Sequence, residues 1–221
     1  VCEDADVDQA AQAVAVAKMR GAGQVCIAAN RFLVHEGIAA EFTAKVSEVL
    51  AGFRLGRATD EGVTFGALSG ADQVATVQKL VDDALAQGAT VASGGVLPAG
   101  LPAGGSYFPA TVLTNVPTTA DIAHSEIFGP VVAIRTFATE DEGIAMANDT
   151  PFGLAAYVFA GDTGRALTIA ERIEAGMVAI NKGTISDPAA PFGGVKESGV
   201  GREGGMEGIG EYLEPKYISL L

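Results

Sequence analysis

The chain has 221 residues, 48% of them hydrophobic, and carries a formal net charge of −13. This length suits one large domain, or one domain with a small appendage. So acidic a chain is a poor partner for nucleic acid or for an anionic membrane, and no apolar run approaches the roughly 20 residues of a membrane-spanning helix.

The chain contains only two cysteines, Cys2 and Cys26. Two cysteines make no disulfide framework, and the acidic N-terminal residues are unlike a signal peptide. We therefore expect a protein of a reducing compartment, the cytoplasm. The chain begins with Val1 inside a sequence that already has the pattern of folded structure, so we expect a fragment, with processing of the chain as the alternative.

The first half of the chain is predicted to be mostly helical. Asp6 is a suitable N-cap for the first helix, and Gly21 ends it. The predicted elements are a helix over 7–20, a strand over 31–35, an amphipathic helix with Phe42, Val46, Val49, Leu50 and Phe53, and a helix over 72–87. The inward residues of the first and third helices are Ala10, Val14 and Ala17, and Val74, Val77, Val81 and Leu85.

In the second half, short β-like runs alternate with helical ones. The predicted strands cover residues 89–92, 111–113, 131–137, 155–160 and 177–181. The predicted helices cover residues 140–148 and 163–175, and the second of them buries Ile169 and Ile173. Strands separated by helices indicate an α/β fold with a largely parallel sheet flanked by helices.

The C-terminal residues have a different character. Residues 193–210 are dense in glycine, and residues 217–221 form a β-like run at the end of the chain. A lone strand at a chain end must pair with something, either a partner subunit or an edge of its own sheet. We place a boundary near Ile209, between a body of residues 1–208 and a C-terminal arm of residues 209–221.

The sequence GAGQVC at residues 21–26 lies between a predicted helix end and a strand. Its small residues allow tight backbone packing and can present the side chain of Cys26. The thiolate is the form of cysteine that acts as a nucleophile. The site must therefore lower the pKa of the thiol or supply a base that removes its proton. Spacing alone leaves two interpretations open for Cys26, a catalytic nucleophile or a buried structural thiol; for Cys2 we expect the structural role.

Four motifs in order resemble those of the aldehyde dehydrogenase superfamily and span nearly the whole chain. They are GQVC with ANR at residues 23–31, EIFGP at 126–130, NDTPFGL at 148–154, and PFGGVK, SG and GRE within 191–203. The resemblance implies the catalytic domain of that fold. It also implies that Cys26 adds to an aldehyde, that hydride leaves to NAD or NADP, and that water hydrolyses the resulting thioester. The backbone N–H of Cys26 is the candidate donor to the oxyanion.

The resemblance assigns roles to four further residues. Glu126 would hold hydroxyls of the nicotinamide ribose, with Phe128 packed beside it; without the resemblance they are a loop carboxylate and a core aromatic. Phe192 would line the aldehyde tunnel, or else pack in the core. Glu203 would belong to the water relay, or else pair with Arg202.

Parts of the family machinery are missing from this sequence. The general-base glutamate of a Glu-Leu-Gly-Gly-type motif precedes the segment that resembles the start of this chain. The dinucleotide-binding domain and its asparagine oxyanion donor are also absent, and no G-x-G-x-x-G fingerprint occurs. We expect most of the cofactor to be bound elsewhere and this chain alone to be inactive. No metal site is expected.

Within the family, the chain is most similar to succinate semialdehyde dehydrogenases at Arg20 and around Ser186. There an arginine and a serine hold the distal carboxylate, and a guanidinium can donate two parallel hydrogen bonds to it. The alternatives are a cation at a helix C-terminus for Arg20 and a turn hydroxyl for Ser186. Ala28 replaces the second cysteine of a redox switch, so we expect no switch.

Several functional interpretations remain open at this stage. Another ω-carboxylated semialdehyde, such as the five-carbon glutarate semialdehyde, differs by one methylene, worth only about 1–3 kcal/mol. A non-catalytic module that keeps the fold, and an assembly module based on the C-terminal strand, belong to other classes. We expect the full-length protein to be a homodimer or homotetramer that acts on a small-molecule aldehyde.

Overall fold

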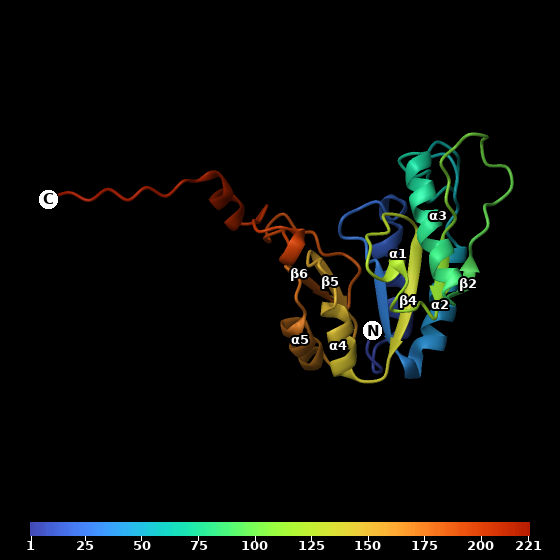
Figure 1. Ribbon diagram of the computed structural model, residues 1–221, viewed down its shortest axis with the longest axis horizontal. Coiled ribbons are helices and arrows are strands. Elements are labelled where there is room, and N and C mark those ends of the chain that lie inside the picture. Colours follow the sequence, from blue (N-terminus) through green and yellow to red (C-terminus); the bar gives the residue numbers. More distant parts are fainter.

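The computed structural model describes residues 1–221, and its larger part is built on a four-stranded sheet (Figure 1). The strand order is β1-β4-β3-β2, in which β1, β4 and β3 run parallel and β2 is antiparallel to β3. Residues 131–134 of β4 are all buried, as expected of a central strand covered on both faces. The bounds are β1 Arg31–His35, β2 Thr90–Gly94, β3 Thr111–Thr114 and β4 Val131–Phe137.

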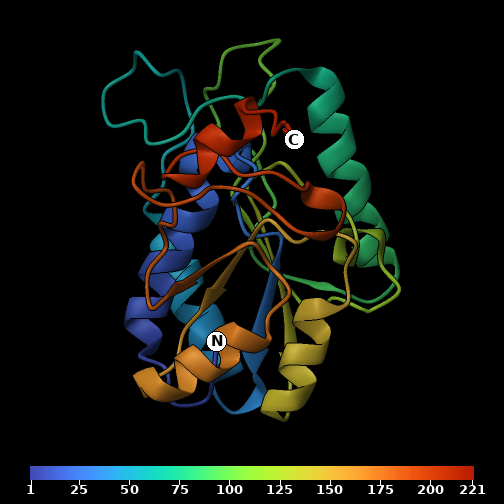
Figure 2. The same ribbon diagram turned by 90° about the vertical axis from the view of Figure 1, so that its left-hand side faces the viewer.

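Three helices cover this sheet. Figure 2 shows α1 (Val7–Met19) and α2 (Ala39–Ala51) on one side and α3 (Ala71–Ala86) on the other. Asp6 caps α1 as predicted, because its carboxylate accepts a hydrogen bond from the backbone N–H of Gln9 at 2.9 Å. The apolar faces of these helices and the sheet form one cluster of 34 buried residues.

A second, smaller layer contains the parallel strands β5 (Ala155–Val158) and β6 (Met177–Ile180) with helices α4 (Glu140–Asn148) and α5 (Thr163–Arg172). It has its own cluster of six buried residues, which includes Cys2. The N-terminus lies between this layer and the larger sheet (Figure 1). The backbone of residues 1–2 therefore contacts both sheets.

The predicted elements in the body of the chain are confirmed, several with the same bounds. One predicted inward residue is wrong: Leu85 is 37% exposed, whereas Leu80 and Ala84 are buried with Val77 and Val81. At about 100° per residue, the four buried side chains form a stripe about 100° wide, and Leu85 falls just outside its edge, in the last turn of α3. The sheet is also divided in two, although its strands are largely parallel as predicted.

The prediction of a strand over residues 217–221 is wrong for this chain. After the short 3₁₀ helix η5 (Glu207–Tyr212) the backbone extends away from the body (Figure 1), and Tyr217, Ile218 and Leu220 are exposed. A strand needs a neighbour to take its backbone hydrogen bonds, and no edge of the chain's own sheets supplies one. None of the helices is long and apolar enough to cross a membrane.

Candidate active site

Cys26 lies on a loop whose shape comes from three consecutive left-handed residues. Helix α1 gives way to η1 (Arg20–Gly23), where Gly21, Ala22 and Gly23 have φ of 59°, 57° and 79°. The side chain of Gln24 then fixes the loop, because it donates to the carbonyl of Gly21 at 3.1 Å and accepts from the N–H of Ser69 at 2.8 Å. The thiol of Cys26 is left exposed, as the predicted role requires.

The cysteine loop packs directly on the segment of residues 126–130. A Cβ at Gly23 would lie 2.2 Å from the carbonyl oxygen of Gly129, so no larger residue fits this approach of the two backbones. The side chain of Asn30 accepts a hydrogen bond from the N–H of Ile127 at 3.0 Å. Two motifs about 100 residues apart in the sequence are thereby held together.

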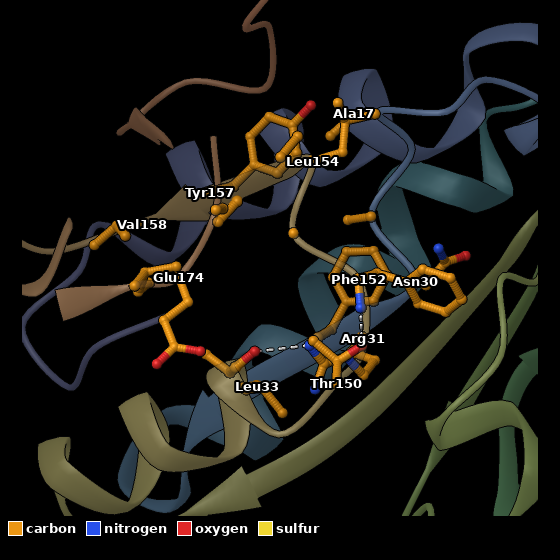
Figure 3. A pocket seen from close by; sticks show the side chains of 18 of the residues that line it. Ala17, Asn30, Arg31, Leu33, Thr150, Phe152, Leu154, Tyr157, Val158 and Glu174 are labelled. Carbon is orange, nitrogen blue, oxygen red and sulfur yellow. Dashed lines mark hydrogen bonds between the residues drawn. The ribbon is translucent and has the colours of Figure 1, made fainter. Parts of the chain in front are cut away.

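A cavity of about 450 Å³ lies between the two sheets (Figure 3). Each of the four sequence motifs contributes to its wall, through Cys26, Glu126, Phe152 and Ser198. The third and fourth motifs are also bonded to each other, because Ser198 accepts from the N–H of Gly153 at 2.9 Å. The structure therefore unites the motifs that the sequence could only place in order.

Tyr157, on β5, faces the cysteine loop and was not singled out from the sequence. Its hydroxyl donates to the carbonyl of Ile27 at 2.8 Å. Burial raises the pKa of Tyr157 to about 12; the nearby Cys26 adds to this rise and Arg20 opposes it. The phenol is thus protonated at neutral pH and lies near both of these residues. The only signal in the sequence was a lone tyrosine in a strand of small apolar residues.

Lys18, on α1, is a second residue that sequence reasoning missed. Its side chain is fully buried, and its Nζ atom has no hydrogen-bond partner. Burial lowers the pKa of Lys18 to about 7, against the opposing effect of the Glu126 carboxylate. The signal was its position four residues after Val14, on the helical face that was predicted to be buried. A buried amine, whose charged form is disfavoured by desolvation, therefore lies near the candidate ribose-binding carboxylate.

The other predicted site residues do not line the cavity that Cys26 and Glu126 share. Arg20 is exposed at the end of α1, and Phe128 is half-buried with a φ of 50°. Ser186 is exposed in the loop after β6 and makes no hydrogen bond through its side chain.

Phe192 and Glu203 are joined to each other through their backbones. Two reciprocal N–H to carbonyl bonds of 2.7 Å pair them, with Phe192 half-buried and Glu203 exposed. Arg202 instead donates to the carbonyls of Gly194 and Gly201 at 2.7 and 2.8 Å. Arg202 and Glu203 therefore form no ion pair, and the carboxylate of Glu203 is free in this structure.

Comparisons with known proteins agree with the motifs. A family model described as "Aldehyde dehydrogenase family" matches residues 1–218. The chain is 44% identical to a glutarate-semialdehyde dehydrogenase of Pseudomonas putida and 46% identical to a succinate-semialdehyde dehydrogenase of Paenarthrobacter nicotinovorans. In both cases it is matched over its whole length but covers only 45% and 48% of the relative.

A solved structure gives the same result for the fold. The succinate-semialdehyde dehydrogenase from Burkholderia pseudomallei superposes with a TM-score of 0.92 at 44% identity. The match covers 96% of this chain and 43% of that one. The chain therefore spans about half the length of the proteins that it matches.

The two thiols are expected to react at different rates. Cys26 is exposed, whereas Cys2 is buried and burial raises the pKa of its thiol. Under native conditions iodoacetamide should alkylate Cys26 at least about tenfold faster than Cys2, as measured by peptide mass spectrometry. Equal rates in the native protein, with both thiols reactive in denaturant, would contradict the exposure of the loop.

The packing of Gly23 on Gly129 gives a stability prediction. Gly23→Ala should lower the free energy of unfolding by about 2 kcal/mol or more, because the new methyl group meets backbone that cannot rotate away. The matched control is Gly210→Ala, where a Cβ would meet nothing within 4 Å. Denaturant titrations that give the two variants equal stability would show that the loop is not held in this way.

Lys18 gives a pH prediction. In the unfolded chain its pKa returns to the ordinary 10.5, so between pH 7 and 10.5 the unfolded state binds more protons than the folded state. Stability should therefore rise with pH in this window, by up to about 1.4 kcal/mol per unit from this residue. Lys18→Met should remove that slope, and Lys79→Met, at an exposed position of α3, should keep it. Equal slopes in both variants would contradict a buried, unpartnered amine.

Proposed function

The chain belongs to the aldehyde dehydrogenase family, and from this premise we propose that it supplies the nucleophile of an NAD(P)-dependent oxidation of succinate semialdehyde to succinate. The observation that carries the proposal is the exposed Cys26, held on a loop against residues 126–130 in a cavity walled by all four motifs. Because the chain spans about half the length of its relatives, the activity is that of a longer protein.

Cys26 is proposed to hold the substrate covalently during the reaction. Its thiolate adds to the aldehyde carbon, and the carbonyl electrons move onto oxygen to give a thiohemiacetal. The backbone N–H of Cys26 is positioned on the same loop to donate to that oxygen. When the cofactor is bound, it supplies a hydride acceptor. Cys26 then holds the acyl group as a thioester until water releases the acid and restores the thiolate.

The chain offers a fit for the nicotinamide end of the cofactor only. Glu126 is an exposed carboxylate on the wall of the cavity that contains Cys26, and such a group accepts hydrogen bonds from ribose hydroxyls. Phe128, two residues on, is half-buried and offers an apolar surface beside the ribose. The sequence holds no dinucleotide fingerprint, so the rest of NAD or NADP is proposed to bind outside these residues.

Recognition of a carboxylate at the far end of the aldehyde is assigned to Arg20, with Ser186 as a second donor. Arg20 is an exposed arginine six residues before the nucleophile. Arg20 and Cys26 both act on the pKa of Tyr157, so both lie near that side chain. In a chain of net charge −13, a dianionic product needs such a local cation. The two relatives described above are named for semialdehydes of four and five carbons, so glutarate semialdehyde is the alternative substrate.

The remaining predicted residues take supporting roles in this proposal. Phe192 forms apolar wall along the path of the aldehyde, and the free carboxylate of Glu203 orders water for hydrolysis of the thioester. The base that activates this water is proposed to lie outside the 221 residues, so the chain alone should not turn over. The exposed apolar arm of residues 209–221 is proposed to pair with a partner subunit in a homodimer or homotetramer.

The role of Arg20 is tested in the protein restored to the length of its relatives. Arg20→Ala should lower kcat/KM for succinate semialdehyde about 10- to 100-fold, because a charge-assisted hydrogen bond contributes about 1.5–3 kcal/mol. Oxidation of butanal, which lacks the carboxylate, should change less than about twofold. Steady-state kinetics on both aldehydes measures the difference.

Arg57→Ala is the matched control, because it removes an exposed arginine far from Cys26 in the sequence and should leave both substrates unaffected. Equal losses for the semialdehyde and butanal in Arg20→Ala would point to a damaged loop. An unchanged kcat/KM for both aldehydes would show that Arg20 does not bind the carboxylate. Its role would then be that of a cation at the C-terminal end of α1.

A further inference from the structure

The loop after β6, residues 181–186, leaves the smaller layer and lies against α1 of the larger one. The side-chain amide of Gln9, on α1, donates to the carbonyl of Asn181 at 3.3 Å. Two residues further along the loop, a Cβ at Gly183 would lie 2.2 Å from the carbonyl oxygen of Ala13 and 2.9 Å from its carbonyl carbon. The backbones of loop and helix are therefore in direct contact, and only glycine fits at residue 183.

Asn181 fixes the point at which the loop leaves β6. Its backbone is left-handed, with a φ of 52°, a conformation that asparagine adopts more readily than most residues. Its side chain accepts from the N–H of Ala160 at 3.0 Å and donates to the carbonyl of Ala160 at 2.9 Å. Its own N–H donates to the carbonyl of Val158 at 2.8 Å. These three bonds set the direction in which the loop starts.

The two contacts with α1 show which way the loop runs along the helix. The contact moves from Gln9 to Ala13 as the loop advances from Asn181 to Gly183. Four helical residues rise by about 6 Å, and two extended residues span up to about 7 Å, so the loop is close to fully extended. It runs towards the C-terminal end of α1, where Arg20 begins the cysteine loop.

The loop keeps this extended form beyond Gly183. Residues 181, 183 and 185 are half-buried whereas residues 182, 184 and 186 are exposed, which is the alternation of an extended segment with one side against a surface. A turn forms only later, where the N–H of Ala190 donates to the carbonyl of Asp187 at 3.1 Å. Ser186 therefore lies at the end of one extended run that starts at Asn181.

The lengths of the two segments bring Ser186 to Arg20. Three extended residues after Gly183 span about 10 Å, and the seven residues of the helix after Ala13 also rise by about 10 Å. Seven residues are almost two complete helical turns, so Arg20 leaves α1 on the face that Gly183 contacts. Both side chains are exposed, and the hydroxyl of Ser186 makes no hydrogen bond within the chain.

We propose that Gly183 and Asn181 are positioning residues for the length of the substrate, because they fix the register of residues 181–186 on α1 and with it the separation of Ser186 from Arg20. The inference rests on the proposed function, in which these two side chains bind the distal carboxylate. Arg20 keeps its distance from Cys26 through the cysteine loop. A loop displaced from α1 would move Ser186 outward, which weakens binding of a four-carbon semialdehyde more than that of a five-carbon one.

The first test is the kinetics of Gly183→Ala in the protein restored to the length of its relatives. The new methyl group pushes the loop off α1, so KM for succinate semialdehyde should rise about tenfold while kcat changes less than about twofold. KM for glutarate semialdehyde should rise less, and the oxidation of butanal should be unchanged. In a double variant, the effects of Gly183→Ala and Arg20→Ala should combine to less than their product, because both changes weaken one carboxylate site.

Asn181→Gly is a milder second variant, because glycine keeps the left-handed backbone and removes only the amide bonds. It should give the same pattern with smaller changes. Gly66→Ala is the matched control, since Gly66 is also half-buried but a Cβ there would meet nothing nearer than the carbonyl oxygen of Gly56 at 3.8 Å. It should leave all three aldehydes unaffected. Equal losses on butanal and succinate semialdehyde in Gly183→Ala, or effects that multiply in the double variant, would overturn the proposal.

The second test measures the register without any substrate. Arg20→Cys and Ser186→Cys, combined with Cys26→Ser, should be bridged by dibromobimane, a reagent that links two neighbouring thiols, and Gly183→Ala should slow this bridging about tenfold or more. Alkylation of each single-cysteine variant by iodoacetamide controls for access to the thiols and should be unchanged by Gly183→Ala.

The two tests separate this inference from the function on which it rests. Absence of bridging, or bridging at the same rate with Gly183→Ala, would overturn the inference whatever the kinetics show. Bridging that Gly183→Ala slows, in a protein whose kinetics are unaffected by Arg20→Ala, would uphold the register and contradict the proposed carboxylate site instead.

Discussion

The candidate site depends on the approach of two stretches of backbone, at Gly23 and Gly129. Only glycine at residue 23 allows the carbonyl of Gly129 to come so near, and the bond from Ile127 to Asn30 holds the same contact from the side. The proposed chemistry needs this contact between the two segments. An exposed thiol and an exposed carboxylate, Cys26 and Glu126, are brought to one cavity from segments separated by 100 residues.

Tyr157 supports that site from the smaller sheet. It lies on β5, and its hydroxyl donates to the carbonyl of Ile27, the residue that follows the nucleophile.

Much of the fold could be predicted because local patterns determine it. The strands 31–35 and 131–137 have the predicted bounds, since β-branched and aromatic runs between turn residues leave little choice. The errors arose where long-range contacts decide. Leu85 faces outward although it is apolar, and the terminal run 217–221 has no neighbour to make it a strand. The helical period places Lys18 on the buried face of α1, but the lack of a partner for its amine and the contact of Tyr157 with the cysteine loop depend on packing between segments distant in the sequence.

The central claim, that Cys26 carries the acyl group, is tested most directly by trapping. The protein restored to family length would be mixed with succinate semialdehyde and oxidised cofactor, quenched in acid during turnover and digested for peptide mass spectrometry. The account predicts a succinyl group on the peptide that contains Cys26, absent without cofactor and lost as turnover ends. Full turnover with an unmodified Cys26, or an acyl group on another residue, would contradict it.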